Sequence, residues 1–515
     1  MNNQSRGRYF SKKHYQPEEL PKFSEERHRL PSPTLEGNPE WVAMYWKAWE
    51  IAFTRLKKPK PCSPFVSNWI DEGLSVDGVD ECLYQWDTIF MVMFARYGHS
   101  VFPAIQSMDN FYCRQHDDGL IWRVIREDDG SDHWWGGGEN FARAINPPLF
   151  AWAEVESFKL TGDKSRFEMV IPVLEKYAEW IEAHRKSDVH GLYWNNGQGC
   201  GYDNTPRDEG RIGDPNQHSA TDPQGWVDFS AQMVIQYNEL AAMCDELDRD
   251  EQAKNFRKLA RQIADKINQW CWNPETGLYH DVDVEGKQTS WKTIAAFWPL
   301  LARIADSEKQ EALIKNLRDP GQFWRPTIFP SLAADQPYYD PTGNYWRGGV
   351  WAPTNYMVIK GLEACGHESF ARECSIRYLE TLSTVFQETG TLWEMYAPDA
   401  HAPGTTEKKG KICCPDFVGW TGCGPIALLI ENVLGLRADG VRRTLTWHLN
   451  REDRHGIDEL PVGSSNVSVM CEAADNSDRR KLTVCCTDQL TLAVKASDRE
   501  QTFDLKAGNH EIIFN

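Results

Sequence analysis

The sequence predicts a mainly helical protein, an (α/α)6 toroid of six helical hairpins, followed by a small β-domain. Two observations lead to this fold class. Apolar residues recur mostly at helical spacing from about residue 38 to about residue 435, in twelve segments, several of which pair across short polar turns. After about residue 440 the apolar period changes to two, which is typical of strands.

Each helical segment carries its own apolar stripe. The clearest spans 248–271, where Phe256, Ile263 and Ile267 mark one face. Turns such as Thr-Gly-Asp at 161–163 are short, and short turns join antiparallel helices. The segments lie near 38–57, 85–97, 99–115, 147–160, 163–186, 226–246, 248–271, 293–304, 307–318, 351–365, 367–388 and 423–435.

The connectors between hairpins are long, and this favours a ring with a functional rim. They span 116–146, 187–225, 272–292, 319–350 and 389–422. Loops of this length in a compact domain are usually functional. The alternative all-helical arrangement is an open solenoid, but the chain shows no fixed repeat of about 30–45 residues.

The chain divides into three parts. Residues 1–37 are a polar lead-in, residues 38–437 form the expected helical domain, and residues 438–515 form the expected β-domain. In the last part, alternating segments at 444–449, 467–471, 481–485, 490–494 and 511–514 predict strands. These strands carry few aromatic residues, so we expect a sheet that packs on the helices rather than a carbohydrate-binding module.

Composition excludes several partners. A formal net charge of −19 argues against nucleic acid or an anionic membrane, since both require basic patches. No apolar run is long enough to span a bilayer, and residues 1–30 lack the apolar region of a secretory signal. The 14 cysteines include no CxxC pair, so we expect reduced thiols and a cytoplasmic protein. No metal site is indicated, and the oligomeric state stays open.

Two acidic residues in long connectors are the candidate catalytic groups. Asp203 lies in Gly-Tyr-Asp-Asn-Thr-Pro-Arg at 201–207, and Glu394 lies in Leu-Trp-Glu-Met-Tyr at 392–396. Either residue alone would more often be structural, because Asp before Asn-Thr-Pro commonly forms a turn. Together they can hydrolyse a glycosidic bond, one protonating the leaving oxygen and the other activating water.

Aromatic and polar residues of the same connectors are candidate substrate-binding residues, since Trp and Tyr rings stack on sugar rings. Asp87 either caps its helix or binds sugar hydroxyls, and Asp228 is either a helix-dipole partner or a supporting acid. Arg347, beside two glycines, either meets a ligand or forms a cation–π stack. The candidates are Trp86, Asp87, His133, Trp134, Trp135, Arg207, Asp228, Trp346, Arg347 and Trp351.

Over most of residues 80–435, these segments resemble glycoside hydrolase family 63 and the related mannosylglycerate-hydrolase-like (α/α)6 glycosidases. The segment at 201–207 resembles the family's general-acid segment, Trp-Glu-x-Tyr at 393–396 its general-base segment, and Tyr-Trp-Arg-Gly at 345–348 its barrel motif. Gln-Trp-Asp at 85–87 is similar to its early substrate-binding segment. Phe-Val-Gly-Trp-Thr-Gly at 417–422 is similar to the stretch that opens its last helix. The resemblance adds Tyr396 and Trp420 to the candidates.

The resemblance implies inverting hydrolysis without a cofactor. Asp203 would act as the general acid with a raised pKa, and Glu394 would stay ionised and hold the attacking water. Their carboxyl groups should then lie about 6.5–9.5 Å apart. We expect an exo-acting enzyme that releases a terminal sugar from a short α-linked glucoside or mannoside, because Trp-rich loops should close a pocket.

Two departures leave the sugar and the aglycone open. The family's usual Gly-Pro-Ile-Trp is replaced by Gly-Gly-Val-Trp at 348–351, and the large N-terminal β-domain of many members is absent. Two other functions also stay open. A sugar epimerase would use paired histidines, for which His133, His218 and His280 are candidates, and a non-catalytic glycan-binding protein would not need both acids.

Overall fold

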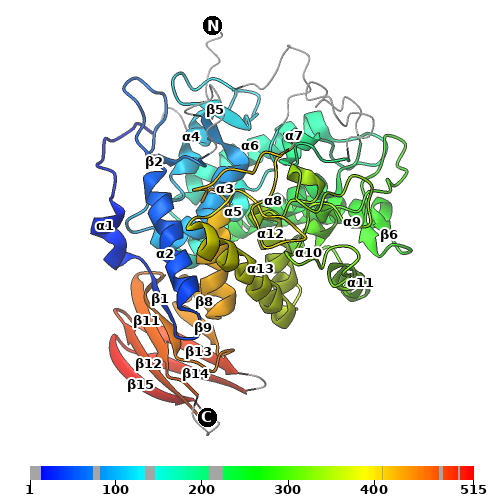
Figure 1. The fold of residues 1–515 in the computed structure, drawn as a ribbon. Coiled ribbons are helices and arrows are strands. Elements are labelled where there is room, and N and C mark those ends of the chain that lie inside the picture. The colour runs from blue at the N-terminus through cyan, green and yellow to red at the C-terminus, as the bar shows by residue number, and fades with distance from the viewer. Residues whose placement is uncertain are drawn as a thin grey trace.

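The structure is a computed structural model that describes residues 13–73, 82–133, 145–207, 224–408, 410–474, 479–496 and 499–514. It is mainly helical, with β-sheets at one end of the helical body (Figure 1). This confirms the predicted combination of a helical region and a C-terminal β region.

Every predicted helical segment contains a helix. They are α2 (Pro39–Thr54), α3 (Gln85–Ala95), α4 (Ser107–Cys113), α5 (Phe150–Thr161), α6 (Phe167–Arg185), α8 (Val227–Glu246), α9 (Asp250–Trp270), α10 (Trp298–Leu301), α11 (Ser307–Leu317), α12 (Ala352–Ala364), α13 (Glu368–Thr389) and the π-helix η7 (Gly424–Val433). The short helices α1 (Phe23–Glu26) and α7 (Gly197–Cys200) were not predicted. Short 3-10 helices lie at 27–29, 96–98, 294–297 (η4), 345–347 and 421–423 (η6).

Six helices contact one another in a cycle. Helix α3 contacts α5, α5 contacts α8, α8 contacts α10, and α10 contacts α12; α12 contacts η6 and η7, and η7 contacts α3. Every residue of α3 and of η7 is buried, as expected for helices that are apolar all round. By contrast, α9 buries only Ala253, Phe256, Ala260, Ile263 and Ile267, so it lies outside the cycle with one face to solvent.

The C-terminal region contains two sheets rather than one. The first has the antiparallel order β1 (Ser32–Leu35), β10 (His455–Val462), β11 (Ser465–Cys471), β12 (Arg480–Cys486) and β15 (Gly508–Phe514). The second has the order β14 (Arg499–Leu505), β13 (Leu490–Ala496), β9 (Thr444–His448) and β8 (Leu436–Asp439), with β13 and β9 parallel. All five predicted strands are present; β1, β8, β10 and β14 were not predicted.

Local features explain two of the missed strands. The pairing of β10 with β11 shifts register between Ile457 and Leu460, and Glu459 has a φ of 58°, so its apolar period is broken. Strand β1 contains Pro33 and lies in the polar lead-in, yet it pairs with β10. A proline is acceptable there because β1 is an edge strand.

Three antiparallel two-stranded sheets pair β2 (Leu56–Lys57) with β3 (Trp69–Ile70), β4 (Cys82–Tyr84) with β5 (Val124–Arg126), and β6 (Trp272–Asn273) with β7 (Leu278–Tyr279). All fourteen cysteines are free thiols. Within the described part of the chain, every helix is too short or too polar to cross a membrane.

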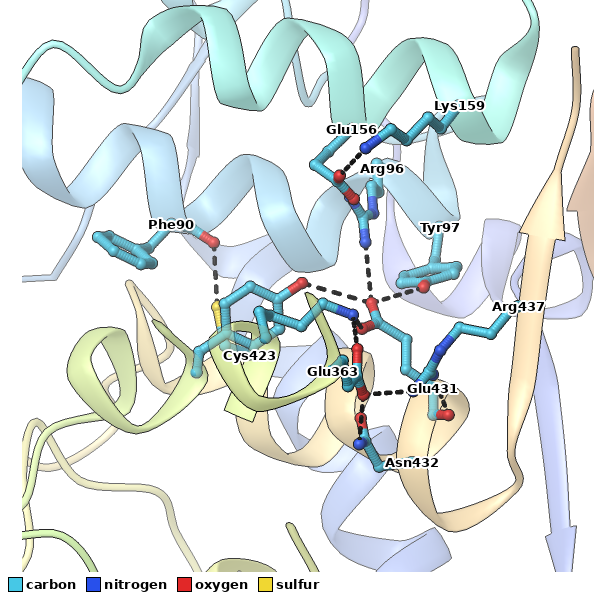
Figure 2. Close-up of polar contacts among 12 residues, drawn as sticks. Phe90, Arg96, Tyr97, Glu156, Lys159, Glu363, Cys423, Glu431, Asn432 and Arg437 are labelled. Atoms are coloured by element: carbon cyan, nitrogen blue, oxygen red, sulfur yellow. Dashed lines mark hydrogen bonds and ion pairs between the residues drawn. The ribbon is translucent and has the colours of Figure 1, made fainter. Parts of the chain in front are cut away.

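A buried ionic network joins the carboxyl ends of three ring helices to the β-domain (Figure 2). Glu431 of η7 accepts hydrogen bonds from Arg96 Nη2 (2.8 Å), Tyr97 Oη (2.7 Å) and Lys360 Nζ (2.8 Å). Arg437 of β8 donates to the carbonyl oxygen of Glu431. Cations are favourable at helix carboxyl ends, so the network both neutralises these ends and fastens β8 to them.

The Glu431 carboxylate should stabilise the protein in a pH-dependent way. Lys360, Arg96 and Arg437 outweigh burial and lower its pKa from 4.5 to about 2. Its contribution is therefore complete above about pH 4.5 and is lost as the pH falls toward 2. We expect Glu431→Gln to lower the free energy of unfolding at pH 7 by about 3–5 kcal/mol, measured by urea denaturation.

Exposed Glu380 provides the matched control, because Glu380→Gln removes the same charge from the surface of α13. A Glu431→Gln variant as stable as Glu380→Gln at pH 7 would contradict the role given to this network. So would a stability difference from the native protein that grows as the pH falls below 4.5.

Candidate active site

The Asp203 loop is fastened to the chain around residue 345. Tyr202 N–H donates to the carbonyl of Gly197 (2.7 Å), which closes the turn after α7. Asn204 Nδ2 donates to the carbonyl of Asn344 (3.0 Å), and its Oδ1 accepts from Trp346 N–H (2.7 Å). These bonds hold the loop that contains Asp203 against the segment around residue 345, which is far away in the sequence.

Trp86 fixes the other side of this loop. Gly201 has a φ of +78°, and a Cβ there would lie 3.2 Å from the Trp86 ring. A side chain at position 201 would thus be disfavoured by both conformation and space. The Trp86 ring also packs edge-on against Tyr202, with centroids 6.2 Å apart.

The segment 344–351 builds an aromatic wall. Trp346 lies parallel to Trp351 with ring centroids 4.4 Å apart, and Trp346 also packs on Tyr202 at 4.3 Å. A Cβ on Gly349 would lie 2.3 Å from the Tyr345 carbonyl oxygen, so this turn requires glycine. Tyr345 itself has a φ of +61°. Non-glycine residues in this region often mark functional sites.

Glu394 is buried, with 2% of its surface exposed, and three hydrogen bonds fix its backbone and its carboxylate. Glu394 N–H donates to the Cys414 carbonyl (3.0 Å), and Cys414 N–H donates to Glu394 Oε2 (3.2 Å). Trp420 Nε1 donates to the Glu394 carbonyl (2.7 Å) and packs edge-on against Trp351 at 5.5 Å. Glu394 thus lies beside the aromatic wall.

The carboxyl groups of Asp87, Asp203 and Glu394 lie close enough to affect one another's ionisation. Burial raises the pKa of Asp203 to about 6, opposed by Arg123. Burial also raises the pKa of Glu394 to about 7 and that of Asp87 to about 8. The charge on Asp203 adds to both of these increases, and the charge on Glu394 adds to that of Asp87.

One electrostatic expectation was wrong. The raised pKa of Asp203 agrees with the prediction, but Glu394 was expected to stay fully ionised. Glu394 is more deeply buried than half-buried Asp203, and Arg123 lowers the pKa of Asp203, so the pKa of Glu394 rises further.

Asp87 does not cap helix α3. Tyr84 occupies the capping position, and Asp87 lies in the first turn. Asp87 is 4% exposed, and its Oδ1 has no hydrogen-bond partner among the described residues. A buried acceptor without a partner is costly, and this favours the alternative prediction that Asp87 meets a ligand.

Arg207 and Asp228 meet each other rather than the aromatic wall. Arg207 Nη1 and Nη2 donate to the two oxygens of Asp228 (2.7 and 2.8 Å), and its Nε and Nη2 donate to Asp281 (2.7 Å each). The guanidinium also stacks over Trp226 at 4.1 Å. Both residues are buried, so they act as an ionic anchor at the end of the Asp203 loop.

Three other candidates surround this centre. Arg347 Nε donates to the Asn204 carbonyl (3.4 Å). Tyr396 is buried, and its backbone pairs with that of Val350. Its hydroxyl accepts from Trp393 N–H (3.4 Å), so Tyr396 supports the segment that contains Glu394. Burial and nearby arginines lower the pKa of His133, a half-buried residue. Trp134 and Trp135 lie outside the described residues.

Sequence reasoning missed several residues of the site. Tyr345 faces Asp203 and Glu394, since both carboxylates affect the pKa of its hydroxyl. Asp281 completes the Arg207 anchor. Tyr345 lay inside a recognised motif, but the chain pairing that brings Asp281 to Arg207 had no sequence signal. Among the described residues no group of three His, Cys, Asp or Glu side chains is arranged to hold a metal ion.

Comparisons with known proteins identify the family to which most of the chain is similar. Residues 83–410 match the family model described as "Mannosylglycerate hydrolase MGH1-like glycoside hydrolase domain". An uncharacterized protein of Borreliella burgdorferi is 29% identical over 406 residues, covering 77% of this chain and 80% of its own. A probable mannosyl-oligosaccharide glucosidase of Schizosaccharomyces pombe is 24% identical over 284 residues, covering 49% of this chain and 33% of its own.

Solved structures share the fold. The GH63 mannosylglycerate hydrolase of Thermus thermophilus in complex with glucose is 19% identical, with a TM-score of 0.59 over 75% of this chain and 99% of that one. The same hydrolase in complex with Tris and D-glycerate has a TM-score of 0.58 at 17% identity, with the same coverage.

The Arg207 anchor should be required for activity. Arg207→Lys keeps the charge but cannot make the two paired contacts with Asp228 and Asp281. We expect it to lower kcat/KM by at least about tenfold and to lower the denaturation midpoint. Arg442→Lys, at an exposed arginine of the β-domain, is the matched control. If Arg207→Lys equalled Arg442→Lys in both measurements, the anchor would have no role in holding the loop.

Proposed function

The chain belongs to the mannosylglycerate hydrolase MGH1-like glycoside hydrolase family, and on that premise we propose that it is an inverting, exo-acting glycoside hydrolase. It releases a terminal sugar from a short α-linked glucoside or mannoside. The observation that carries this proposal is the placement of Asp203 and Glu394, from loops far apart in the sequence, as electrostatically coupled groups beside the Trp346–Trp351 wall.

We assign the chemical roles from the motif resemblance and the surroundings of each acid. Asp203 is the general acid that protonates the leaving oxygen, and Glu394 is the general base that activates water. The proposed separation of about 6.5–9.5 Å leaves space for that water. The pKa order of the ligand-free site, with Glu394 above Asp203, would by itself favour exchanged roles, so the assignment requires its own test.

The aromatic wall and Asp87 form the proposed sugar-binding part of the site. Trp346 and Trp351 are buried and stack on each other, so they shape this side of the site, while the unpartnered Asp87 Oδ1 accepts from a sugar hydroxyl. Arg123, next to Asp203, supplies positive charge for an anionic aglycone. The Thermus structures with glucose and with D-glycerate and the name of the Schizosaccharomyces pombe relative support testing both glycosylglycerates and glucosides.

We also propose an overall helical architecture and a cellular location for the protein. The contact cycle of α3, α5, α8, α10, α12 and η7, with other helices outside it, supports an (α/α)6 barrel. Fourteen free thiols favour a cytoplasmic location.

An epimerase is less well supported. Both ring nitrogens of His280 lie at hydrogen-bond distance from protein atoms, Thr276 Oγ1 and the Trp291 carbonyl, so they are not available to a sugar. The second candidate, His133, is half-buried, and its pKa is lowered. The third, His218, lies outside the described residues. A binding protein without catalysis would not need two coupled carboxyl groups.

Leaving-group dependence separates the acid from the base. We expect Asp203→Asn to lose roughly 10²–10⁴-fold in kcat on a glycoside with a poor leaving group. On the corresponding α-glycosyl fluoride it should lose far less, because fluoride departs without protonation. Glu394→Gln should lose activity on both substrates, since water attack is needed in each case. The opposite pattern would exchange the two roles, and full activity of both variants would refute hydrolysis by this pair.

A substrate panel tests the sugar and the linkage. We expect release of a monosaccharide from at least one short α-linked disaccharide, oligoglucoside or glycosylglycerate, and none from β-linked analogues. Glu394→Gln protein, purified in parallel, controls for contaminating hydrolases. Activity only on β-linked substrates or on long polymers would contradict the proposed substrate class.

A further inference from the structure

Arg347 lies against the loop that carries the proposed general acid. Its Nε donates to the carbonyl of Asn204 (3.4 Å), the residue that follows Asp203, and its side chain is partly exposed. The guanidinium forms no ion pair with any residue that the structure describes. Because a guanidinium has five N–H donors, several of them are available to a ligand that reaches this side of Asp203.

Tyr338 places an exposed aromatic ring beside this guanidinium. The Arg347 guanidinium carbon lies 5.6 Å from the centroid of the Tyr338 ring. Tyr338 is 53% exposed, and its φ is +70°, a conformation that residues other than glycine rarely adopt. Residues held in such conformations are frequent at ligand-binding sites, so the ring is a candidate ligand contact.

The turn that presents Tyr338 is fixed by its neighbours. Tyr339 Oη donates to Asp399 (2.9 Å), and Asp340 N–H donates to the carbonyl of Arg347 (2.8 Å). The second bond ties the turn to the segment 344–351, which also holds the Asp203 loop. A ligand therefore does not have to order this turn in order to bind to it, and this lowers the cost of binding.

Trp291 continues the surface beyond Tyr338. Its ring centroid lies 6.1 Å from that of Tyr338, and the side chain is partly exposed. Contacts thus run from Asn204 through Arg347 and Tyr338 to Trp291. A glycerate-sized aglycone would occupy only the part beside Asp203. A sugar aglycone has hydroxyls that can accept from Arg347 and an apolar ring face that can pack on Tyr338.

We propose that Arg347, Tyr338 and Trp291 form an aglycone subsite, which binds a sugar ring on the leaving-group side of Asp203. The substrate is then an oligosaccharide rather than a glycosylglycerate. The inference rests on the proposed function for the position of the bond that is cleaved. Binding of a sugar chain to these side chains can be measured without hydrolysis.

Binding tests the subsite directly. Glu394→Gln protein is titrated calorimetrically with glucose, maltotriose, mannose and an α-linked mannotriose. At least one trisaccharide should bind more tightly than its monosaccharide. Adding Tyr338→Gly should weaken binding of that trisaccharide by about threefold to tenfold and have little effect on the monosaccharide. Glycine accepts the positive φ at this position, so the ring is removed without strain in the turn.

Two further variants control the binding experiment. Tyr338→Phe keeps the ring and should restore most of the affinity for the trisaccharide. Met169→Ala removes an exposed apolar side chain of α6 and controls for general surface effects.

Kinetics with two leaving groups test the position of the subsite. On the trisaccharide, we expect Tyr338→Gly to lower kcat/KM by about threefold to tenfold. On the corresponding α-glycosyl fluoride the loss should be smaller, because fluoride has no aglycone sugar for the ring to contact. Equal losses on both substrates would contradict a position on the leaving-group side.

The two readouts separate the possible failures. If no trisaccharide binds more tightly than its monosaccharide, or if Tyr338→Gly binds the trisaccharide as tightly as its parent does, the inference is wrong. If Tyr338→Gly weakens binding of the trisaccharide but no glycoside is hydrolysed, the proposed function is at fault and the sugar-binding role of these residues stands.

Discussion

The structure depends on the burial of three carboxyl groups at one end of its helical ring. Burial raises the pKa of Asp87, of Asp203 and of Glu394, and the charge on Asp203 adds to the increase at Asp87 and Glu394. Such a cluster is unfavourable by itself. It persists because neighbouring groups are fixed by other contacts: the parallel Trp346–Trp351 pair, the Asn204 bonds and the Arg207 anchor.

The opposite end of the ring shows how partners decide the direction of a pKa shift. Glu431 is as buried as Glu394, but its pKa is lowered to about 2 because Lys360, Arg96 and Arg437 surround it. The two carboxylates differ in their neighbours rather than in their burial. One end of the ring is thus electrostatically satisfied and fastened to the β-domain, while the other retains protonatable groups that can take part in chemistry.

Periodicity predicted the helices, most clearly where a long helix has one apolar face, as in α9. It failed for β1 and β10, where a proline or a shift of register removes the alternation. At the site, motifs pointed to Asp203, Glu394 and the tryptophans. They could not distinguish Arg207 as an anchor, because its partners Asp228 and Asp281 lie 21 and 74 residues away.

The central claim is that Asp203 and Glu394 act on opposite sides of one glycosidic bond, with water between the base and the sugar. The stereochemistry of the first product tests this most directly, because a single displacement by water inverts the anomeric carbon. Proton NMR of an active α-linked substrate, recorded before mutarotation, should show the β-anomer first. Initial release of the α-anomer would indicate two displacements and would contradict the assignment of Glu394 as a base that activates water.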